Sequence, residues 1–483
     1  MSEPDFDFIV LGGGSAGYSG AAQAARLGLK TAVIEGGREV GGLCILRGCM
    51  PSKTLLESGH RAEAIRGAGE FGLRAEYFGA DGAAIRARKR RLIGDFADYR
   101  RQQLERGQFE FVRGEAAFVD PHTIEVRLCD GGLRRLSARA FLIATGSRVQ
   151  WREIPGLRET GFWTSDELLD ADHIPGSVIV LGGGAIALEA ASYYAGIGSR
   201  VSVIQRGDQV LKETDADVAD ALTEALIHRG IEIFRGTNLL RAERAGDAKR
   251  VHFSDAGGER FVEAEEIIYA LGREPVTDTL ALENAGVTMK GKSIAADAHQ
   301  RCGPAHVFAA GDVCGPFEVV HIAIQQGELA ARNAARQLGR GEGSLEAMDY
   351  RLALLAVFTH PQMASVGMTE REAHERGQEV RMAKYAFADH GKSMVRGDTH
   401  GFVKLIADCK TGCILGGACV GPEASELIHE IVVAMHFRAT AHDLARVPHY
   451  HPTLSEIWTY PADELAGAEL RAAESSPGDM PKC

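Results

Sequence analysis

This chain of 483 residues has few cysteines, no long apolar run and no excess of positive charge. Nine cysteines are far too few for a secreted disulfide scaffold, so we expect any disulfide to take part in chemistry rather than to stabilise the fold. No run of about eighteen apolar residues is present, which predicts a soluble protein without a membrane span. The net charge of -12 repels polyanions, so neither nucleic acid nor an anionic membrane is an expected partner.

The N-terminus and the length add further expectations. Met1 to Asp7 carry three acidic residues where a secretory leader would carry lysine or arginine, which predicts no export signal and a cytoplasmic location. At about 150 residues per domain, the length predicts roughly three domains. The basic run from Arg86 to Arg91, followed by Arg100 and Arg101, is typical of a solvated helix face, with a polyanion site as the alternative.

Two stretches of the chain repeat one strand–helix–strand pattern. In each, an apolar run ends at three consecutive glycines, small residues with helical spacing follow, and a second apolar run closes the unit. The glycine triplets are residues 12–14 and 182–184. Strands that alternate with helices favour parallel sheets, so the pattern predicts two nucleotide-binding units of the same kind.

The first unit has the spacing of a dinucleotide-binding turn. Its residues are Gly12, Gly14, Ser15, Ala16 and Gly17. Glycines there let the backbone approach a pyrophosphate at the helix N-terminus. Glu35 closes the next strand, where a carboxylate accepts hydrogen bonds from a ribose diol. We expect a dinucleotide at this turn, and the alternative is an ordinary glycine-rich turn.

The second unit differs from the first at the end of its second strand. Its turn consists of Gly182, Gly184 and Ala187. The strand ends in Gln205 and Arg206 instead of an acid, and Lys212 follows. Two cations near the strand end would neutralise a 2'-phosphate, which favours NADPH over NADH. Alternatively, both basic side chains point into water.

Cys44 and Cys49 lie close together in the segment from Gly41 to Lys53. Cysteines at this spacing can form a disulfide if their Cα atoms come within about 7 Å. Such a short loop would stabilise the fold by only about 2 kcal/mol. A zinc site would need two further ligands at a matching spacing, and the sequence offers none. Redox chemistry is therefore the better interpretation of the pair, and no metal is expected.

The C-terminal part of the chain changes from alternating units to a hairpin and a helix. Residues 402–406 and 413–420 alternate around the turn signal at 410–412, and residues 425–437 have helical spacing. This pattern predicts a third domain of α+β type. Residues 468–483 contain serine, proline and glycine, and we expect them to form a loose tail.

Five motifs occur in a fixed order along the chain. They are Cys44-x4-Cys49-Met-Pro-Ser-Lys53, Ala144-Thr145-Gly146, Leu271-Gly272-Arg273, Ala310-Gly311-Asp312 and His451-Pro-Thr-Leu-Ser-Glu456. With these motifs the chain resembles, over essentially its whole length, the two-dinucleotide flavoprotein disulfide reductases. That family includes dihydrolipoamide dehydrogenase, glutathione reductase and mercuric reductase.

The resemblance implies an α/β fold with two doubly wound Rossmann-like domains, one for FAD and one for NAD(P), and a C-terminal α+β dimerisation domain. The FAD-binding domain would be split between residues 1–155 and 281–345. The NAD(P)-binding domain would span 156–280 and the dimerisation domain 346–467, with the tail at 468–483. A homodimer whose active site is shared between the subunits is also implied.

The cofactor contacts of the family carry over onto matching positions. The first glycine turn and Glu35 would hold the adenosine diphosphate half of FAD, and Asp312 would bind the flavin ribityl chain. The second turn would hold the pyridine nucleotide. Lys53 and Glu189 match a pair that the family places beside the flavin. Further implied cofactor-binding positions are Gly42, Thr145, Gly146, Gly272, Arg273 and Gly311.

The resemblance also implies the path of the electrons from NAD(P)H to a disulfide. Cys49 would be the charge-transfer thiolate next to the flavin, and Cys44 the interchange thiol that attacks the substrate. His451 of the other subunit would supply and recover a proton, with Glu456 holding its tautomer. Without the family, a histidine beside proline near a C-terminus is more often structural.

Several positions depart from the family pattern. Leu43 stands where the family usually has threonine, and Leu46-Arg47 where it has Asn-Val. Arg47 would lower the pKa of a cysteine in the loop, or else point to solvent.

Clues to the substrate conflict with one another. The Pro-Ser-Lys after Cys49 resembles dihydrolipoamide dehydrogenase, whereas Arg206 and Lys212 resemble the NADPH-using glutathione reductase branch. Mercuric reductases use a vicinal cysteine pair near the C-terminus, and this chain ends in Cys483 alone. We expect a small or lipoyl-type disulfide. A glutathione-type disulfide, mercuric ion, and a non-catalytic flavoprotein subunit of a larger complex are the alternatives.

Overall fold

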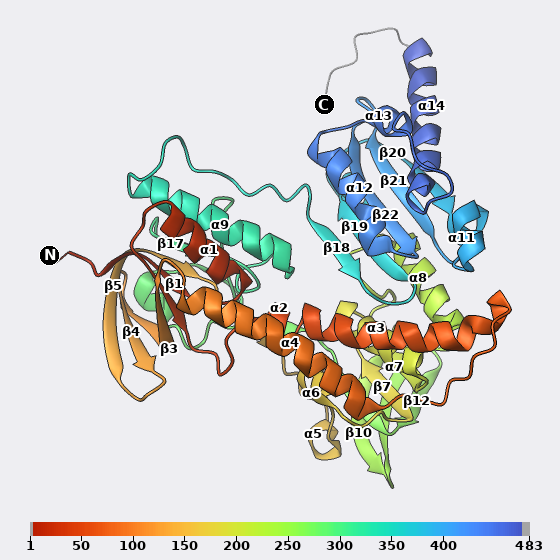
Figure 1. Cartoon of the computed structure of the whole chain (residues 1–483), viewed down its shortest axis with the longest axis horizontal. Helices are drawn as coiled ribbons and strands as arrows, with labels where there is room; N and C mark the ends of the chain where they lie inside the picture. The colour runs from red at the N-terminus through yellow and green to blue at the C-terminus, as the bar shows by residue number, and fades with distance from the viewer. Residues whose placement is uncertain (1–2, 476–483) are drawn as a thin grey trace. The chain divides into compact units, whose positions relative to one another are not determined.

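The computed structural model describes residues 3–475, with side chains described for residues 3–467. The chain forms two compact units, whose elements are labelled in Figure 1. The first unit consists of Met1–Ser52, Arg86–Trp151 and Gly272–Asp349, and the second of Lys53–Ile85, Arg152–Leu271 and Tyr350–Cys483. Among the described residues, no helix has both the length and the apolar character that a membrane crossing needs.

The first unit is built on a sheet with a parallel core. In this core β1 pairs with β2 and β5, β2 also pairs with β3, and β5 also pairs with β17. Strand β4 joins β3 and β5 as an antiparallel meander. The bounds are β1 Phe6–Leu11, β2 Thr31–Glu35, β3 Glu110–Asp120, β4 Thr123–Leu128, β5 Leu133–Ile143 and β17 Val307–Ala309. Strand β2 is buried along its whole length, as expected for a parallel strand covered on both faces.

Helices α1 (Ser15–Arg26) and α9 (Val320–Gln337) pack against each other beside this sheet (Figure 1). Their close approach depends on Gly327, because a Cβ there would lie 2.2 Å from the carbonyl oxygen of Ala16. The other elements of this unit are α2 Leu43–Leu46, most of α4 Gly82–Glu105, β6 Ser147–Val149, β14 Arg273–Pro275, η2 Leu282–Ala285, β15 Met289–Lys290 and β16 Ser293–Ile294.

The second unit contains a parallel sheet in the order β13-β7-β8-β9 and an antiparallel sheet in the order β10-β11-β12. Helix α7 spans Ala185–Ile197, directly after the second glycine triplet, where the sequence pattern predicts a helix. Helix α3 (Cys49–Arg66) crosses α7 at two glycines, where a Cβ on Gly196 would lie 3.0 Å from the Cα of Gly59. The other bounds are η1 Gly67–Phe71, α5 Leu157–Thr160, α6 Ser165–Asp170, β7 Ser177–Leu181, β8 Arg200–Ile204, α8 Ala216–His228, β9 Glu232–Phe234, β10 Asn238–Ala245, β11 Ala248–Asp255, β12 Gly258–Ala264 and β13 Glu266–Tyr269.

The C-terminal part of the second unit is an antiparallel sheet in the order β18-β19-β22-β21-β20. The hairpin expected from the sequence is present as β21 and β22, and the expected helix as α12. The bounds are β18 Leu354–Val357, β19 Gln362–Gly367, α10 Glu370–Glu375, β20 Val380–Ala386, η3 Phe387–Asp389, α11 Gly391–Arg396, β21 Phe402–Asp408, β22 Ile414–Gly421, α12 Ala424–His436, α13 Ala441–Ala445, η4 Ser455–Trp458 and α14 Thr459–Ser475.

The predicted fold class is confirmed, because two parallel strand–helix units and an α+β region are all present. The expected loose tail is wrong for residues 468–475, which continue α14. Alanine, glutamate and leucine in that stretch have high helix propensity, which outweighs the serines near its end. Residues 476–483, including Cys483, lie outside the described residues. Most of the predicted nucleotide-binding region 156–280 and most of the C-terminal region 346–467 fall in the second compact unit, and their boundaries stay a prediction.

Lys404 on β21 is a fully buried cation in the second unit. Its Nζ lies 2.9 Å from Asp215 Oδ2 and 3.1 Å from Asp217 Oδ2, and it also contacts Glu370. These three carboxylates have ligand oxygens within 4.8 Å of one another, so they form a group that could hold a metal ion. The lysine ammonium supplies their positive charge instead.

Replacing Lys404 with methionine should therefore destabilise the protein, because it leaves three neighbouring carboxylates without their central cation. We expect the melting temperature to fall by about 5 °C. Thermal unfolding followed by circular dichroism measures the change. Lys410→Met, in the exposed hairpin turn, is the control and should shift it little. An equal effect of both substitutions would contradict a structural role for Lys404.

Candidate active site

The first glycine turn places backbone donors at the start of α1. Gly12 has a φ of +106°, and a Cβ on Gly17 would lie 1.8 Å from the Gly12 carbonyl oxygen, so both positions require glycine. The Glu35 carboxylate accepts hydrogen bonds from the backbone N–H groups of Gly13 (2.8 Å) and Gly37 (2.6 Å). The acid at the end of β2 is thus held at the glycine turn.

Gly42 brings the cysteine segment onto this turn. It has a φ of +77°, and a Cβ there would lie 2.6 Å from the Cα of Gly14. The backbone of the segment therefore passes directly over the N-terminal end of α1. Any larger residue at position 42 would push the two apart.

Three motifs that are far apart in the sequence meet in the first unit. Asp312 Oδ2 accepts a hydrogen bond of 2.6 Å from the Ser147 hydroxyl, next to Gly146. Arg273 Nε donates to the same hydroxyl at 2.9 Å, and its Nη2 donates to the Ser147 carbonyl at 2.7 Å. Thr145 Oγ1 donates to the carbonyl of Val276 at 2.6 Å. Ser147 thus connects the three predicted motifs.

The second glycine turn repeats this arrangement without the acid. Gln205, which follows β8, occupies the place that Glu35 takes in the first unit, since a Cβ on Gly183 would lie 2.9 Å from the Gln205 side chain. The Gln205 amide donates to the carbonyl of Gln209 at 3.1 Å. Arg206 is exposed, and the exposed Lys212 lies 3.5 Å from Glu213.

Lys53 and Glu189 form the ion pair that the family resemblance implies. Lys53 Nζ donates to both carboxylate oxygens of Glu189 at 2.8 Å. Glu189 is nearly buried, with a side chain 9% exposed, whereas Lys53 is 29% exposed. The ammonium group therefore retains access from one side while the carboxylate fixes its position.

Cys44 and Cys49 lie on either side of a short turn in the first unit. Cys44 is in α2, and Cys49 is the first residue of α3. The structure holds both as partly exposed thiols. Arg47, in the turn between them, donates to Glu39 at 3.0 Å. Arg47 thus has a carboxylate partner in the same segment, and its effect on the cysteines stays a prediction.

His451 and Glu456 meet in the C-terminal part of the second unit. Nδ1 of His451 lies 3.0 Å from Glu456 Oε2, and the histidine side chain is 77% exposed. Glu456 is buried and also lies 3.4 Å from Nε2 of the fully buried His390. A buried carboxylate thus orients an exposed imidazole and leaves the Nε2 edge of that ring for proton exchange.

Family models match nearly the whole chain. The pyridine nucleotide-disulphide oxidoreductase model matches residues 6–327, and the model of the corresponding dimerisation domain matches residues 355–462. The chain belongs to the pyridine nucleotide-disulphide oxidoreductase family. The dimerisation domain implies a homodimer.

Individual members of this family are similar along most of the chain. Mercuric reductase of Bacillus cereus is 34% identical over 454 residues, which cover 94% of this chain and 70% of that protein. Dihydrolipoyl dehydrogenase of Geobacillus stearothermophilus is 32% identical over 464 residues, which cover 96% of each chain. The structure of a Cu(II) complex of HOCl-induced flavoprotein disulfide reductase RclA from Escherichia coli gives a TM-score of 0.82 at 26% identity, covering 96% of this chain and 100% of that one.

As a member of this oxidoreductase family, the protein uses FAD and NAD(P)H. The first unit fits the adenosine diphosphate part of FAD, because its glycine turn exposes backbone donors and Glu35 stands beside it. The Ser147, Arg273 and Asp312 cluster fits a polyhydroxylated chain. In the second unit, nothing within 4 Å would meet a Cβ on Gly184, so the N-terminal end of α7 is open to a phosphate.

Two contacts in this oxidoreductase could not be predicted from any sequence motif. The backbone N–H of Phe358 donates to Glu189 Oε1 at 3.1 Å, and Lys53 Nζ lies 4.5 Å from the centre of the Phe358 ring. The buried His390 lies beside Glu456. Neither residue belongs to a motif, because each contact joins segments that only the tertiary fold brings together.

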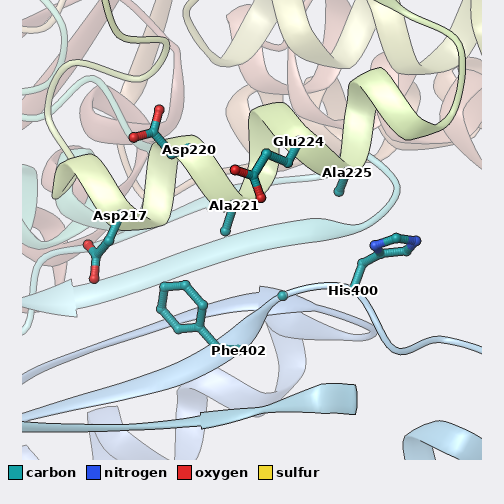
Figure 2. A pocket seen from close by; sticks show the side chains of 8 residues that line it. Asp217, Asp220, Ala221, Glu224, Ala225, His400 and Phe402 are labelled. Atoms are coloured by element: carbon teal, nitrogen blue, oxygen red, sulfur yellow. The ribbon is translucent and has the colours of Figure 1, made fainter.

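A pocket of about 320 Å³ in the second unit is lined by none of the motif residues (Figure 2). Its lining residues are Asp217, Asp220, Ala221, Glu224, Ala225, His400, Gly401 and Phe402. Asp217 is used by Lys404, and Asp220 pairs with Arg235 at 2.7 Å. These acids serve the fold, and we assign the pocket no part in the reaction.

Proposed function

We propose that the protein transfers electrons from NADPH, through FAD and the Cys44/Cys49 pair, to a small or lipoyl-type disulfide. The observation that carries this proposal is the oriented imidazole of His451, exposed and held by a buried carboxylate, in a chain that also has two accessible cysteines in one turn. A flavoprotein that serves only as a carrier subunit has no need of an acid–base histidine and a dithiol together.

The two cysteines divide the chemistry between them. Cys44, as the thiolate, attacks one sulfur of the substrate disulfide, forms a mixed disulfide and displaces the first thiol. Cys49 then attacks the Cys44 sulfur, which releases the second thiol and leaves a Cys44–Cys49 disulfide. When bound, FAD supplies the two-electron link between NADPH and that disulfide.

His451 acts as the general base and general acid in this thiol–disulfide exchange. With Nδ1–H donating to Glu456, the Nε2 edge of the ring takes the proton from Cys44 and returns it to the departing thiolate. We propose that the histidine acts on the cysteines of the partner subunit. The similarity of residues 355–462 to a dimerisation domain supports this arrangement.

The preference for NADPH is supported by the end of β8. In the first unit the corresponding acid binds the glycine turn, whereas the second unit has the neutral Gln205 there. A carboxylate at this place would repel a 2'-phosphate, and its absence removes that repulsion. The exposed side chains of Arg206 and Lys212 add positive charge near the same strand end.

Arg206→Glu tests this cofactor preference. We expect kcat/KM for NADPH to fall about 100-fold, because a cation that faces the 2'-phosphate becomes an anion, with little change for NADH. Steady-state kinetics with each nucleotide measures the effect. Arg200→Glu, at the opposite end of β8, is the matched control and should leave both values unchanged. Equal losses for NADPH and NADH would remove the proposed role of Arg206.

The substrate is tested by anaerobic titration with NADPH, followed by lipoamide, glutathione disulfide and Hg(II) as acceptors. We expect a disulfide to reoxidise the reduced enzyme. Reoxidation by Hg(II) alone would favour the second candidate, mercuric ion reduction, which the similarity to mercuric reductase supports. Reduction of the flavin with no reoxidation by any acceptor would support a carrier subunit.

The small number of cysteines supports a cytoplasmic setting.

A further inference from the structure

His390, which directly precedes α11 in the second unit, is a histidine that solvent does not reach. Its side chain is fully buried, and Nδ1 lies 2.8 Å from the hydroxyl oxygen of the equally buried Ser393. Nε2 is shielded from solvent and has no hydrogen bond of normal geometry among the described residues, but Glu456 Oε1 lies 3.4 Å from it. A carboxylate only accepts hydrogen bonds, so the ring proton belongs on Nε2, with the serine hydroxyl donating to Nδ1.

Glu456 is a nearly buried acid whose surroundings supply few donors. Among residues 3–467, its carboxylate has two partners within hydrogen-bond or ion-pair distance, namely His451 Nδ1 at 3.0 Å and His390 Nε2 at 3.4 Å. The His451 side chain is 77% exposed, whereas that of His390 is 0% exposed. A buried carboxylate is costly unless donors compensate it, and His390 is the partner that is buried with it.

The charge of His390 determines what it does to this acid. Burial lowers the pKa of His390, and the neighbouring charge of Glu456 only partly opposes this effect. The imidazole is therefore neutral near pH 7. A neutral ring directs an N–H toward the carboxylate without cancelling its negative charge, which stays available to His451.

Two tyrosines also face this site. The ring of Tyr460 on α14 lies 6.4 Å from that of His390, centre to centre, and Tyr385 on β20 stacks on Tyr460 at 3.8 Å. Phenols are neutral near pH 7, and burial raises the pKa of Tyr385 further. On the segment of His390 itself, Asp389 and Lys392 are at least partly exposed, so water screens their charges.

We propose that His390 is a positioning residue that, as a neutral donor, holds Glu456 and sets how tightly the His451–Glu456 pair retains its proton. This rests on the proposed function only in treating His451 as the acid and base of the exchange. Without the Nε2–H of His390, the carboxylate would interact more strongly with the His451 imidazolium. The imidazolium would then give its proton to a departing thiolate less readily.

The test is the pH dependence of His451 modification in the holoenzyme. Diethyl pyrocarbonate, which attacks neutral imidazole, is the probe, and modification of the His451 peptide is followed by mass spectrometry. His390→Leu should raise the pH midpoint of modification by about one unit, because the carboxylate loses a donor. His390→Gln retains an N–H donor and should restore most of the shift. The matched control is His400→Leu, an exposed histidine of the same unit whose ring contacts His228, and it should leave the midpoint unchanged.

A second measurement asks whether His390 acts through Glu456. In a Glu456→Gln background, His390→Leu should no longer shift the midpoint, because the charge on which the donor acts is absent. If His390→Leu fails to fold, Ser393→Ala removes the hydroxyl that keeps the ring proton on Nε2 and should shift the midpoint in the same direction.

Three outcomes would overturn the proposal. They are an unchanged or lower midpoint in His390→Leu, an equal shift in His390→Leu and His390→Gln, and a shift that persists in the Glu456→Gln background. An equal shift in the first two variants would mean that packing, and not the donor, is responsible. A normal shift in an enzyme that reduces no disulfide would count against the proposed function alone.

Discussion

Replacing Cys44 with serine is expected to abolish disulfide reduction while NADPH still reduces the flavin. Serine keeps the size of the side chain but is far less acidic than a thiol, so no anion attacks the substrate. We expect disulfide turnover to fall by about 10⁴-fold or more, and the rate of flavin reduction to stay within about threefold of the wild type. Stopped-flow absorbance of the flavin and steady-state assays measure the two steps separately.

The control for this substitution is Cys409→Ser, in the hairpin turn of the C-terminal sheet, which should change neither step. Unchanged disulfide turnover in Cys44→Ser would remove the proposed function. Loss of flavin reduction as well would mean that the substitution has damaged the cofactor site, through the contact between Gly42 and Gly14. In that case Cys44→Ala, which adds no polar group, gives a second measurement.

Replacing His451 with glutamine should lower kcat for disulfide reduction by about 10²–10⁴-fold, since the general acid and base is removed. Glutamine retains a hydrogen-bond donor toward Glu456, so the loop around it should keep its conformation. Flavin reduction by NADPH should be unaffected. His449→Gln, which loses a contact of 2.6 Å to Glu430 on the same segment, controls for general disturbance of the loop.

A hybrid dimer separates a shared site from a site within one subunit. One subunit carries Cys44→Ser and the other His451→Gln, each with a different affinity tag. If the histidine acts on the partner's cysteines, one of the two sites is intact and the hybrid should show about half of the wild-type activity. If each site lies within one subunit, both are defective, and activity no higher than that of the parent homodimers would contradict the shared site.

Elements of secondary structure that depend on a local sequence pattern could be predicted from the sequence. The helix at residues 185–197 and the hairpin around 410–412 follow from periodicity and turn residues within a few positions, and both are present. The end of the chain shows the limit of such reasoning, because its serine, proline and glycine predict a tail, whereas α14 continues to Ser475.

Contacts between distant segments had no such local signal. Phe358 binds Glu189 across 169 positions, and Ser147 joins Asp312 across 165. Arg100 has an ordinary place in a basic helix, and nothing around it in the sequence distinguishes it from Arg101. Only the fold shields the Nε and Nη1 atoms of Arg100 from solvent and leaves Arg101 exposed.

The sequence by itself determined the family, the two nucleotide turns and the cysteine pair. Each of these features depends on residues that lie close together in the chain: the spacing of glycines, an acid at the end of a strand, or two nearby thiols. The tertiary structure decided which charges act on these groups. Burial and distance govern electrostatic effects, and both depend on where the fold places segments that lie far apart in the chain. For this reason Lys53 is paired with Glu189, which lies 136 positions away in the sequence.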